Sequence, residues 1–361
     1  MAAIDVVLPV RNGMPFLAEA IDSIRNQTFH DWRLIVLDHG STDGSFELAR
    51  RYAETDRRIE AFSHPEAKDV TALRNIGLAK CDCRYLMLQD ADDISLADRM
   101  ERSIRAFEER PGLLLVGGQA ILINPQGQRI GYLRMPRGPD AVLAASFFYN
   151  PIAHPTIAAD FRFLQRLGAA YAKDLLNPAP VAESLGIKSL AEDYMLFGQL
   201  AQLGPCANVA EPLIYYRRHP NSVSIANPAG QVALSLTASR FLAKSFCQRN
   251  GLPEFDPGPF CNHADFVFDF QQSSYAGEFA DMASVLRRGL GRSPALEREL
   301  AFRRVLSKRG SVEMASRFVG FELRYTAMPS ERRTIRNWLL RTLRRGKYVY
   351  RAGETTMGLA A

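Results

Sequence analysis

The sequence predicts an α/β fold in which a mostly parallel β-sheet is flanked by helices and followed by a C-terminal helical extension. Three observations support this prediction. Short apolar runs alternate with segments of helical spacing through the first hundred residues, a pattern typical of βαβ units. Turn-forming residues separate these segments. Beyond Asn227-Pro228 the strand signals stop and the pattern becomes mainly helical.

The elements of the first hundred residues each have a local signal. A β-branched run over Asp5–Val10 predicts a strand, and Arg11-Asn12-Gly13 after it is a turn signature. Apolar residues then recur every three or four positions between Phe16 and Asn26, which predicts a helix. The alternation continues with predicted strands at 32–37, 59–62 and 85–89 and predicted helices at 45–52 and 71–79.

Composition excludes several classes of protein. The chain has 361 residues, 47% apolar and 23% charged, which is ordinary for a globular protein and unlike disordered or fibrous chains. A predicted strand begins at Ile4 and leaves no room for a secretory signal. The longest apolar stretch, Leu113–Ile123, is too short to span a bilayer. The five cysteines have neither zinc-ligand nor disulfide spacing, so we expect a cytoplasmic protein.

The most informative residues are three acids, Asp90, Asp92 and Asp93, directly after the apolar run Tyr85–Leu88. Residues two apart in extended chain point the same way, so Asp90 and Asp92 can face a common point. Two carboxylates at a strand end suit a hard cation such as Mg²⁺ or Mn²⁺, completed by water and substrate phosphates. The alternative is a solvated turn that caps the next helix.

The second half of the chain has a more mixed pattern. Short strand and turn signals run from Leu113 to about Ser224, and a helix is predicted from Glu192, with Leu196, Leu200 and Leu203 as its buried stripe. We expect a domain boundary near residue 225. No internal repeat stands out.

Several motifs, taken in order, resemble the inverting family 2 glycosyltransferases, whose fold is of the GT-A type. The resemblance covers residues 4–225 and rests on the following motifs: 7–13 with 27–29, 37–45, Arg74-Asn75-x-Gly77, Asp90-Ala91-Asp92-Asp93, Asn150-Pro151-x-x-His154-Pro155-Thr156, Glu192-Asp193 and Tyr216-Arg217-x-His219. It implies a nucleotide-sugar half at about 1–120 and an acceptor half at about 121–225. Residues 226–361 lie outside it.

The resemblance assigns a nucleotide donor to the first strand ends. Pro9, Val10 and Asn12, with Asp38, are expected to line the uracil and ribose site, and a carboxylate at Asp38 can accept N–H and O–H donors. Asp38 can equally be an acid that ends a strand. His39 departs from the acid or amide usual in the family, which leaves the base of the nucleotide open.

The same resemblance implies how the diphosphate is held. Arg74 is expected near the base and the diphosphate, because a guanidinium donates to phosphate oxygens; the alternative is an exposed surface cation. Asp90 corresponds to a ribose contact and Asp92 to the metal ligand, with the cation bridging diphosphate oxygens. Arg217 and His219 resemble the loop that folds over the diphosphate, and His219 is a further candidate metal ligand. His154 receives no role.

Glu192 and Asp193 are the candidates for the catalytic base. Adjacent helical residues diverge by about 100°, so only one of them can enter the cleft. The resemblance places the base at Asp193, which would take a proton from an acceptor hydroxyl as it attacks the anomeric carbon. For either acid, the structural alternative is a favourable charge at a helix N-terminus.

The tail carries the positive charge of the chain. From residue 301 onward there are 14 Lys or Arg against four Asp or Glu, while the net charge of the whole chain is +6. Ile335, Trp338, Leu339 and Leu343 recur at helical spacing among arginines, so this helix can lie on an anionic membrane or pack on the protein. No recognition motif accompanies the charge, so nucleic acid is not an expected partner.

The sequence therefore predicts a metal-dependent inverting glycosyltransferase. It would move a sugar from a nucleotide-diphospho-sugar, UDP-linked by resemblance, to a hydroxyl of a saccharide or lipid-linked saccharide. Peripheral contact with the inner membrane face would fit such an acceptor. Two alternatives remain. The first is a nucleotidyltransferase of similar fold, although residues 11–15 are a poor match to a triphosphate-binding loop. The second is a non-catalytic nucleotide-sugar-binding protein. The sugar, the acceptor and the oligomeric state are not encoded in these motifs.

Overall fold

A computed structural model describes residues 2–177, 187, 190–220, 222, 227–262 and 274–343. The predicted boundary near residue 225 lies outside these residues and stays a prediction. The strands are β1 (Ile4–Val10), β2 (Trp32–Asp38), β3 (Ile59–Ser63), β4 (Tyr85–Leu88), β5 (Ile94–Ser95), β6 (Leu115–Ile123), β7 (Arg129–Leu133), β8 (Ala158–Asp160) and β9 (Cys206–Arg217).

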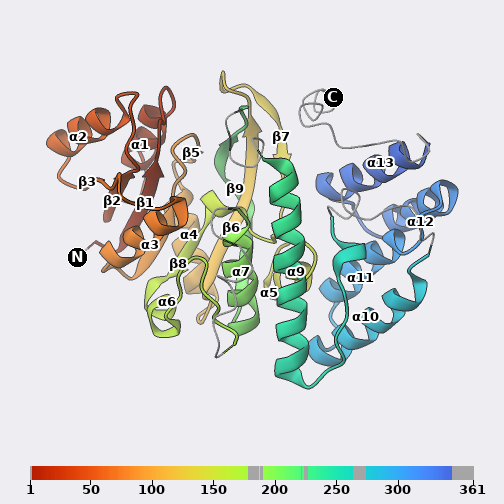
Figure 1. Cartoon of the computed structure of the whole chain (residues 1–361). Helices are drawn as coiled ribbons and strands as arrows, with labels where there is room; N and C mark the ends of the chain where they lie inside the picture. The colour runs from red at the N-terminus through yellow and green to blue at the C-terminus, as the bar shows by residue number, and fades with distance from the viewer. Residues whose placement is uncertain are drawn as a thin grey trace.

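The helices cover both faces of the sheet and form a separate group after it (Figure 1). They are α1 (Leu17–Arg25), α2 (Ser45–Thr55), α3 (Val70–Lys80), α4 (Arg99–Glu109), α5 (Pro139–Ser146), α6 (Phe161–Leu167), α7 (Glu192–Leu203), α9 (Pro228–Asn250), α10 (Ala276–Leu290), α11 (Pro294–Leu306), α12 (Ser311–Arg324) and α13 (Pro329–Leu343).

The strands form one sheet in the order β3-β2-β1-β4-β8-β6-β9-β5, with β7 paired to β6. The α/β class is confirmed, and β3-β2-β1-β4 is parallel as predicted. The second half makes the sheet mixed, because β8 runs antiparallel to both β4 and β6. β8 has only three residues, too few for a recognisable periodicity in the sequence.

Alternate residues of the parallel strands pack into two apolar layers. Val7 and Ile35 face α3 and α7, whereas Val6 and Leu34 face α1, α2 and α4. Gly77 in α3 explains part of one motif: a β-carbon there would lie 2.5 Å from a methyl of Val7. The absence of a side chain lets α3 approach β1 closely, which fixes its N-terminal end beside the strand ends.

The C-terminal helices pack on the sheet domain through α9 and α11. α9 lies between α7 and the later C-terminal helices α10 to α13 (Figure 1). The contact with α7 is close, since a β-carbon on Gly198 would lie 2.3 Å from Leu242. α11 packs against α5. The helical extension is thus joined to the half of the sheet domain that carries the predicted base.

Of the two alternatives for the basic tail, the structure supports packing on the protein. Ile335 and Trp338 are 3% and 1% exposed and lie among Phe302, Val305 and other residues of α11 and α12. This apolar face cannot enter a bilayer while it is buried there. Leu343 and the arginines from 341 on lie outside the described side chains. None of the described helices has the length and apolar character needed to cross a bilayer.

Candidate active site

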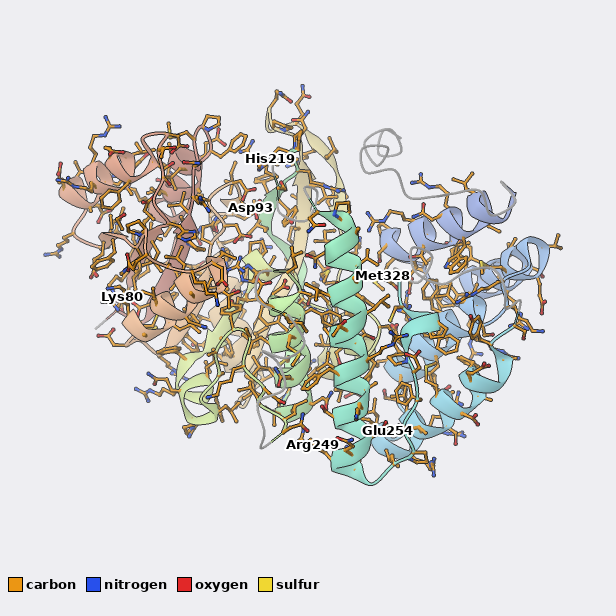
Figure 2. The ribbon with its side chains drawn as sticks, viewed as in Figure 1. Lys80, Asp93, His219, Arg249, Glu254 and Met328 are labelled. Atoms are coloured by element: carbon orange, nitrogen blue, oxygen red, sulfur yellow. The ribbon has the colours of Figure 1, made fainter. Side chains whose placement is uncertain are left out.

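The acidic loop follows β4, which lies in the middle of the sheet between β1 and β8. The side chains of Asp90 and Asp92 are 27% and 30% exposed, whereas Asp93 is 1% exposed. Asp93 turns away from the other two acids: its Oδ1 accepts a 2.7 Å hydrogen bond from the backbone N–H of Arg217. Figure 2 labels Asp93 and His219 at this end of the sheet. The two partly exposed acids, Asp90 and Asp92, are those that the sequence spacing predicted to face a common point.

A buried arginine supports this loop from behind. Arg99, at the start of α4, is fully buried and donates to the carbonyl oxygen of Leu88 at 2.6 Å and to Oε1 of Gln89 at 2.9 Å. It also reaches the carbonyl of Ile157 at 3.2 Å. Sequence reasoning missed this residue, because nothing in its local pattern separates it from a surface arginine of a helix. Its contacts fix where the strand stops and the acids begin.

The acids of the loop influence one another electrostatically. Burial alone would raise the pKa of Asp90, but His154 at 3.5 Å and Arg74 at 3.9 Å lower it below its ordinary value. Burial and the negative charge of Asp90 raise the pKa of Asp92. The side chains of residues 90 and 92 are therefore close enough to repel each other, and a cation between them would relieve that repulsion.

His219 lies beside the acid that the resemblance assigns to the metal. Its Nε2 is 2.8 Å from Oδ2 of Asp92, and its ring centroid is 5.2 Å from that of Phe16. Two carboxylates and an imidazole offer donors of the kind that Mn²⁺ or Mg²⁺ accepts. Within the described part of the chain, no three such side chains by themselves surround a metal position. This donor set fits a cation that takes its remaining ligands from substrate and water.

Arg217 has contacts within the protein that the sequence did not reveal. Its guanidinium is buried and donates to the carbonyl oxygens of Asp92 and Pro125, each at 2.9 Å, and to the carboxylate of Glu19. The side chain therefore holds the acidic loop in place, and its expected role beside the diphosphate stays a prediction. The separation of more than a hundred residues between these partners hid the role from the sequence.

Arg74 and Glu192 meet across the two halves of the domain. Nη1 of Arg74 donates to Oε1 of Glu192, and the two side chains are 13% and 6% exposed. Burial raises the pKa of Glu192, and the Arg74 charge opposes that rise. Arg74 is thus not the exposed surface cation that the sequence left open as an alternative. Its side chain is largely buried and pairs with Glu192. Its position beside Asp90 remains compatible with a phosphate contact.

Asp193 occupies the first turn of α7 with a different set of partners. Oδ2 accepts a 2.8 Å hydrogen bond from Nδ2 of Asn150, and Oδ1 accepts one of 2.7 Å from the N–H of Tyr194. Ala191, immediately before the pair, has φ 59 and ψ 13, a conformation that a β-carbon disfavours. This turn separates the two acids, so that Glu192 points to Arg74 and Asp193 to Asn150.

The expected nucleotide residues lie at the ends of β1 and β2. Asp38 is 1% exposed, and its Oδ2 accepts from the N–H of Gly40 at 3.0 Å and from the hydroxyl of Ser63 at 3.1 Å. Oδ1 of Asn12 accepts from the N–H of Thr42 at 2.9 Å. These side chains join neighbouring strand-end loops. Pro9 and Val10 are buried in β1, in register with Leu37 and Asp38.

Asn150 and His154 are two further residues whose roles the sequence did not reveal. They lie in the quoted motif at 150–156, but the motif alone assigned neither a partner. In the fold, Asn150 holds Asp193 while His154 lies beside Asp90 and 3.1 Å from the hydroxyl of Tyr171. One short loop therefore contacts both the donor-side acid and the candidate base.

Comparison with known proteins found similar glycosyltransferases. The model of the family described as glycosyl transferase family 2 matches residues 5–162. The O-antigen biosynthesis glycosyltransferase WbnJ of Escherichia coli is 28% identical over 249 residues, which are 67% of this chain and 89% of that protein. A putative glycosyltransferase of Bacillus subtilis, EpsE, is 30% identical over 155 residues, 43% of this chain and 55% of that protein.

A solved structure shares the fold over nearly the whole chain. Residues 1–349 of S. aureus TarS, crystallised in complex with UDP-GlcNAc, superpose with a TM-score of 0.56 at 11% identity, covering 96% of this chain and 93% of that one. An uncharacterized glycosyltransferase of Haemophilus influenzae is 26% identical over 61% of this chain and 67% of its own length. The chain thus spans between about half and nine-tenths of these curated relatives.

The fold is that of the GT-A glycosyltransferases, and the curated relatives reported above are glycosyltransferases. More particularly, the match to glycosyltransferase family 2 covers residues 5–162, which is less than half of the chain.

Proposed function

We propose that this protein transfers a sugar from a nucleotide-diphospho-sugar, UDP-linked, to a hydroxyl group of a saccharide or lipid-linked saccharide in cell-surface polysaccharide synthesis. Inversion at the anomeric carbon and dependence on Mg²⁺ or Mn²⁺ belong to the proposal. The observation that carries it is the position of Arg74. This guanidinium contacts both Asp90, on the donor side, and Glu192, the neighbour of Asp193, so the acidic loop and the helix of the base converge on one place.

The donor end would be formed by the strand-end loops of β1, β2 and β4. Asp90 and Asp92 would hold the cation with His219 beside them, and the cation would neutralise charge on the departing diphosphate. Arg74 would donate to phosphate oxygens from the same side. Pro9, Val10, Asn12 and Asp38 remain the proposed lining of the nucleoside site; residues 9 and 10 would act through their backbone, because their side chains are buried.

The acceptor end would be formed around Asp193. Its carboxylate would take the proton from the acceptor hydroxyl as the oxygen bonds to the anomeric carbon. The bond from that carbon to the diphosphate oxygen breaks in the same displacement, which inverts the centre. Glu192 is a poor candidate for the base, because its carboxylate is buried against Arg74. The choice of acceptor would involve residues 171–187, of which 178–186 lie outside the described residues.

A donor screen tests the proposal. Purified protein is incubated with UDP-, GDP- and dTDP-sugars, beginning with UDP-GlcNAc, with Mn²⁺ and with a chelator. We expect Mn²⁺-dependent release of the nucleoside diphosphate from one donor class. Release of inorganic pyrophosphate instead would indicate a nucleotidyltransferase. Binding of no nucleotide in the presence of Mn²⁺ would contradict the proposal, whereas metal-dependent binding without turnover would favour a non-catalytic sugar-nucleotide-binding protein.

A further inference from the structure

Among the described residues, the carboxylate of Asp193 has one side-chain hydrogen-bond partner, Asn150. Hydrogen bonds hold both ends of the Asn150 amide. Nδ2 of Asn150 donates to Asp193 at 2.8 Å, while Oδ1 of Asn150 accepts from the N–H of Ile152 at 3.3 Å. The second contact settles which end of the amide faces the acid, because only the NH₂ group can donate to a carboxylate. Asn150 therefore presents a fixed donor to the candidate base.

The chain just before Asn150 is buried in the C-terminal helices. Phe147, Phe148 and Tyr149 are 0%, 1% and 8% exposed, and they pack with residues of α9, α10 and α11. The hydroxyl of Ser239 in α9 donates to the carbonyl oxygen of Phe147. The N–H of Asn262 lies 3.4 Å from the carbonyl oxygen of Phe148. These three residues therefore belong to the core of the helical extension, although their neighbours form the active site.

Arg303 is the polar centre of this contact. It is fully buried in α11, and its guanidinium carbon lies 4.6 Å from the ring centroid of Phe148 and 5.5 Å from that of Tyr149. Its nitrogen atoms donate to Glu299 at 2.8 Å, and to the carbonyl of Phe260 and Oδ1 of Asn262, both at 2.7 Å. A guanidinium held by several acceptors has a defined plane, so the two rings pack against a rigid surface.

The helix that carries the base rests on the same extension. Tyr194 and Met195 of α7 are buried against Ala238 and Leu242 of α9. The hydroxyl of Tyr194 donates to the carbonyl oxygen of Ser146 at 2.7 Å. Both partners of the Asn150–Asp193 hydrogen bond are thus attached to the helical extension, and their separation depends on how it packs.

We infer that the C-terminal helical extension positions the catalytic base, with Arg303 holding residues 147–149 and Asn150 passing that position to Asp193. Asn150 and Arg303 are positioning residues, and the inference rests on the proposed role of Asp193. Displacing a catalytic group by about 1 Å can cost about 100-fold in rate. A remote arginine that fixes the base should therefore influence turnover without touching either substrate.

The test compares Asn150→Ala, Arg303→Lys and the double variant, with Arg298→Lys as the matched control. Arg298 also lies in α11 and pairs with a glutamate, Glu331 at 2.8 Å, but its guanidinium carbon lies over the ring of Phe321, at 5.4 Å from the centroid. The assay follows nucleoside diphosphate release from the donor that the screen identifies. UDP affinity with Mn²⁺ and the unfolding midpoint are measured alongside. Asn150→Ala should lower kcat on the order of 100-fold and Arg303→Lys roughly tenfold, both with UDP affinity unchanged.

Because Arg303 acts through Asn150, the double variant should be no slower than Asn150→Ala alone. The inference is overturned if Arg303→Lys changes only the unfolding midpoint, as Arg298→Lys should, or if the two losses multiply. Asp193→Asn in the same assay distinguishes an error in the proposed base from an error in the positioning inference. If it keeps its turnover, the proposed base is wrong; if it loses turnover while Asn150→Ala does not, only the positioning inference fails.

Discussion

Arg74 and Glu192, 118 residues apart in the chain, form a buried ion pair between α3 and α7. Removing one partner of a buried pair leaves a charge without compensation and costs about 3–5 kcal/mol of the free energy of unfolding. We expect that loss for Glu192→Ala in urea denaturation. Glu313→Ala is the control, because its pair with Arg317 is largely exposed and is worth at most about 1 kcal/mol. Equal losses in the two variants would contradict the structural role of the pair.

Replacement of the proposed base separates chemistry from binding. Asp193→Asn preserves the shape of the side chain but cannot accept the acceptor proton, and its NH₂ group can no longer accept one of the two hydrogen bonds that the carboxylate receives. Turnover should fall by about 10²–10⁴-fold, the usual contribution of a general base, while Mn²⁺-dependent UDP affinity stays the same. Steady-state kinetics and calorimetry on the same preparation check this. Turnover near that of the wild type would place the base at another residue.

The elements that were predicted closely are those with strong local patterns. β1 and β2 are continuous buried runs, and α1 repeats apolar residues at helical spacing, so their bounds agree with the sequence to within one or two residues. The acids after β4 could also be interpreted from the sequence, because they directly follow a buried apolar run. β8 was not foreseen, since three residues carry no period, and its insertion turns the parallel arrangement into a mixed sheet.

The site residues were harder to predict where the partner is distant in the chain. Arg217 was assigned to the loop over the diphosphate by its motif, but the motif did not reveal that its guanidinium lies against Glu19 and two carbonyl groups. Asn150 was part of a quoted motif, but its partnership with Asp193 depends on packing by the helical extension, which no motif describes. Residue types thus indicated the kind of chemistry, whereas tertiary packing determines which of these side chains face the candidate site.

The buried face of α13 makes a prediction about stability. Trp338 is 1% exposed, and the Arg309 guanidinium lies 4.5 Å from its ring. Trp338→Ala should reduce the free energy of unfolding of the helical extension by about 3–5 kcal/mol, as expected for a large buried side chain. Leu340→Ala, at a position 45% exposed, should change it by less than about 0.5 kcal/mol. A Trp338 variant as stable as the Leu340 variant would show that this face is not part of the core.

The pair Asp56–Arg58 predicts an acid-dependent loss of stability. The hydrogen bonds from the Arg58 guanidinium lower the pKa of Asp56 to about 2. The folded pKa lies below the unfolded value of about 3.9, so the stabilisation is complete above that value and is lost as the pH falls toward 2.

Asp56→Asn should therefore be less stable than the wild type at pH 6, and the difference should shrink at pH 3. Urea midpoints at the two pH values measure it. A difference that is the same at both pH values would contradict the predicted linkage.

The proposed function depends on Asp90 and Asp92 holding a divalent cation that binds the donor diphosphate. Calorimetric titration of UDP, with Mn²⁺ and with a chelator, tests it most directly, with Asp98→Ala as a control acid outside the loop. We expect Mn²⁺ to tighten UDP binding by at least about tenfold, or 1.4 kcal/mol, in the wild type and in the control, and to have no effect in Asp92→Ala. Equal affinity with and without Mn²⁺ in the wild type, or an unchanged metal effect in Asp92→Ala, would contradict the account.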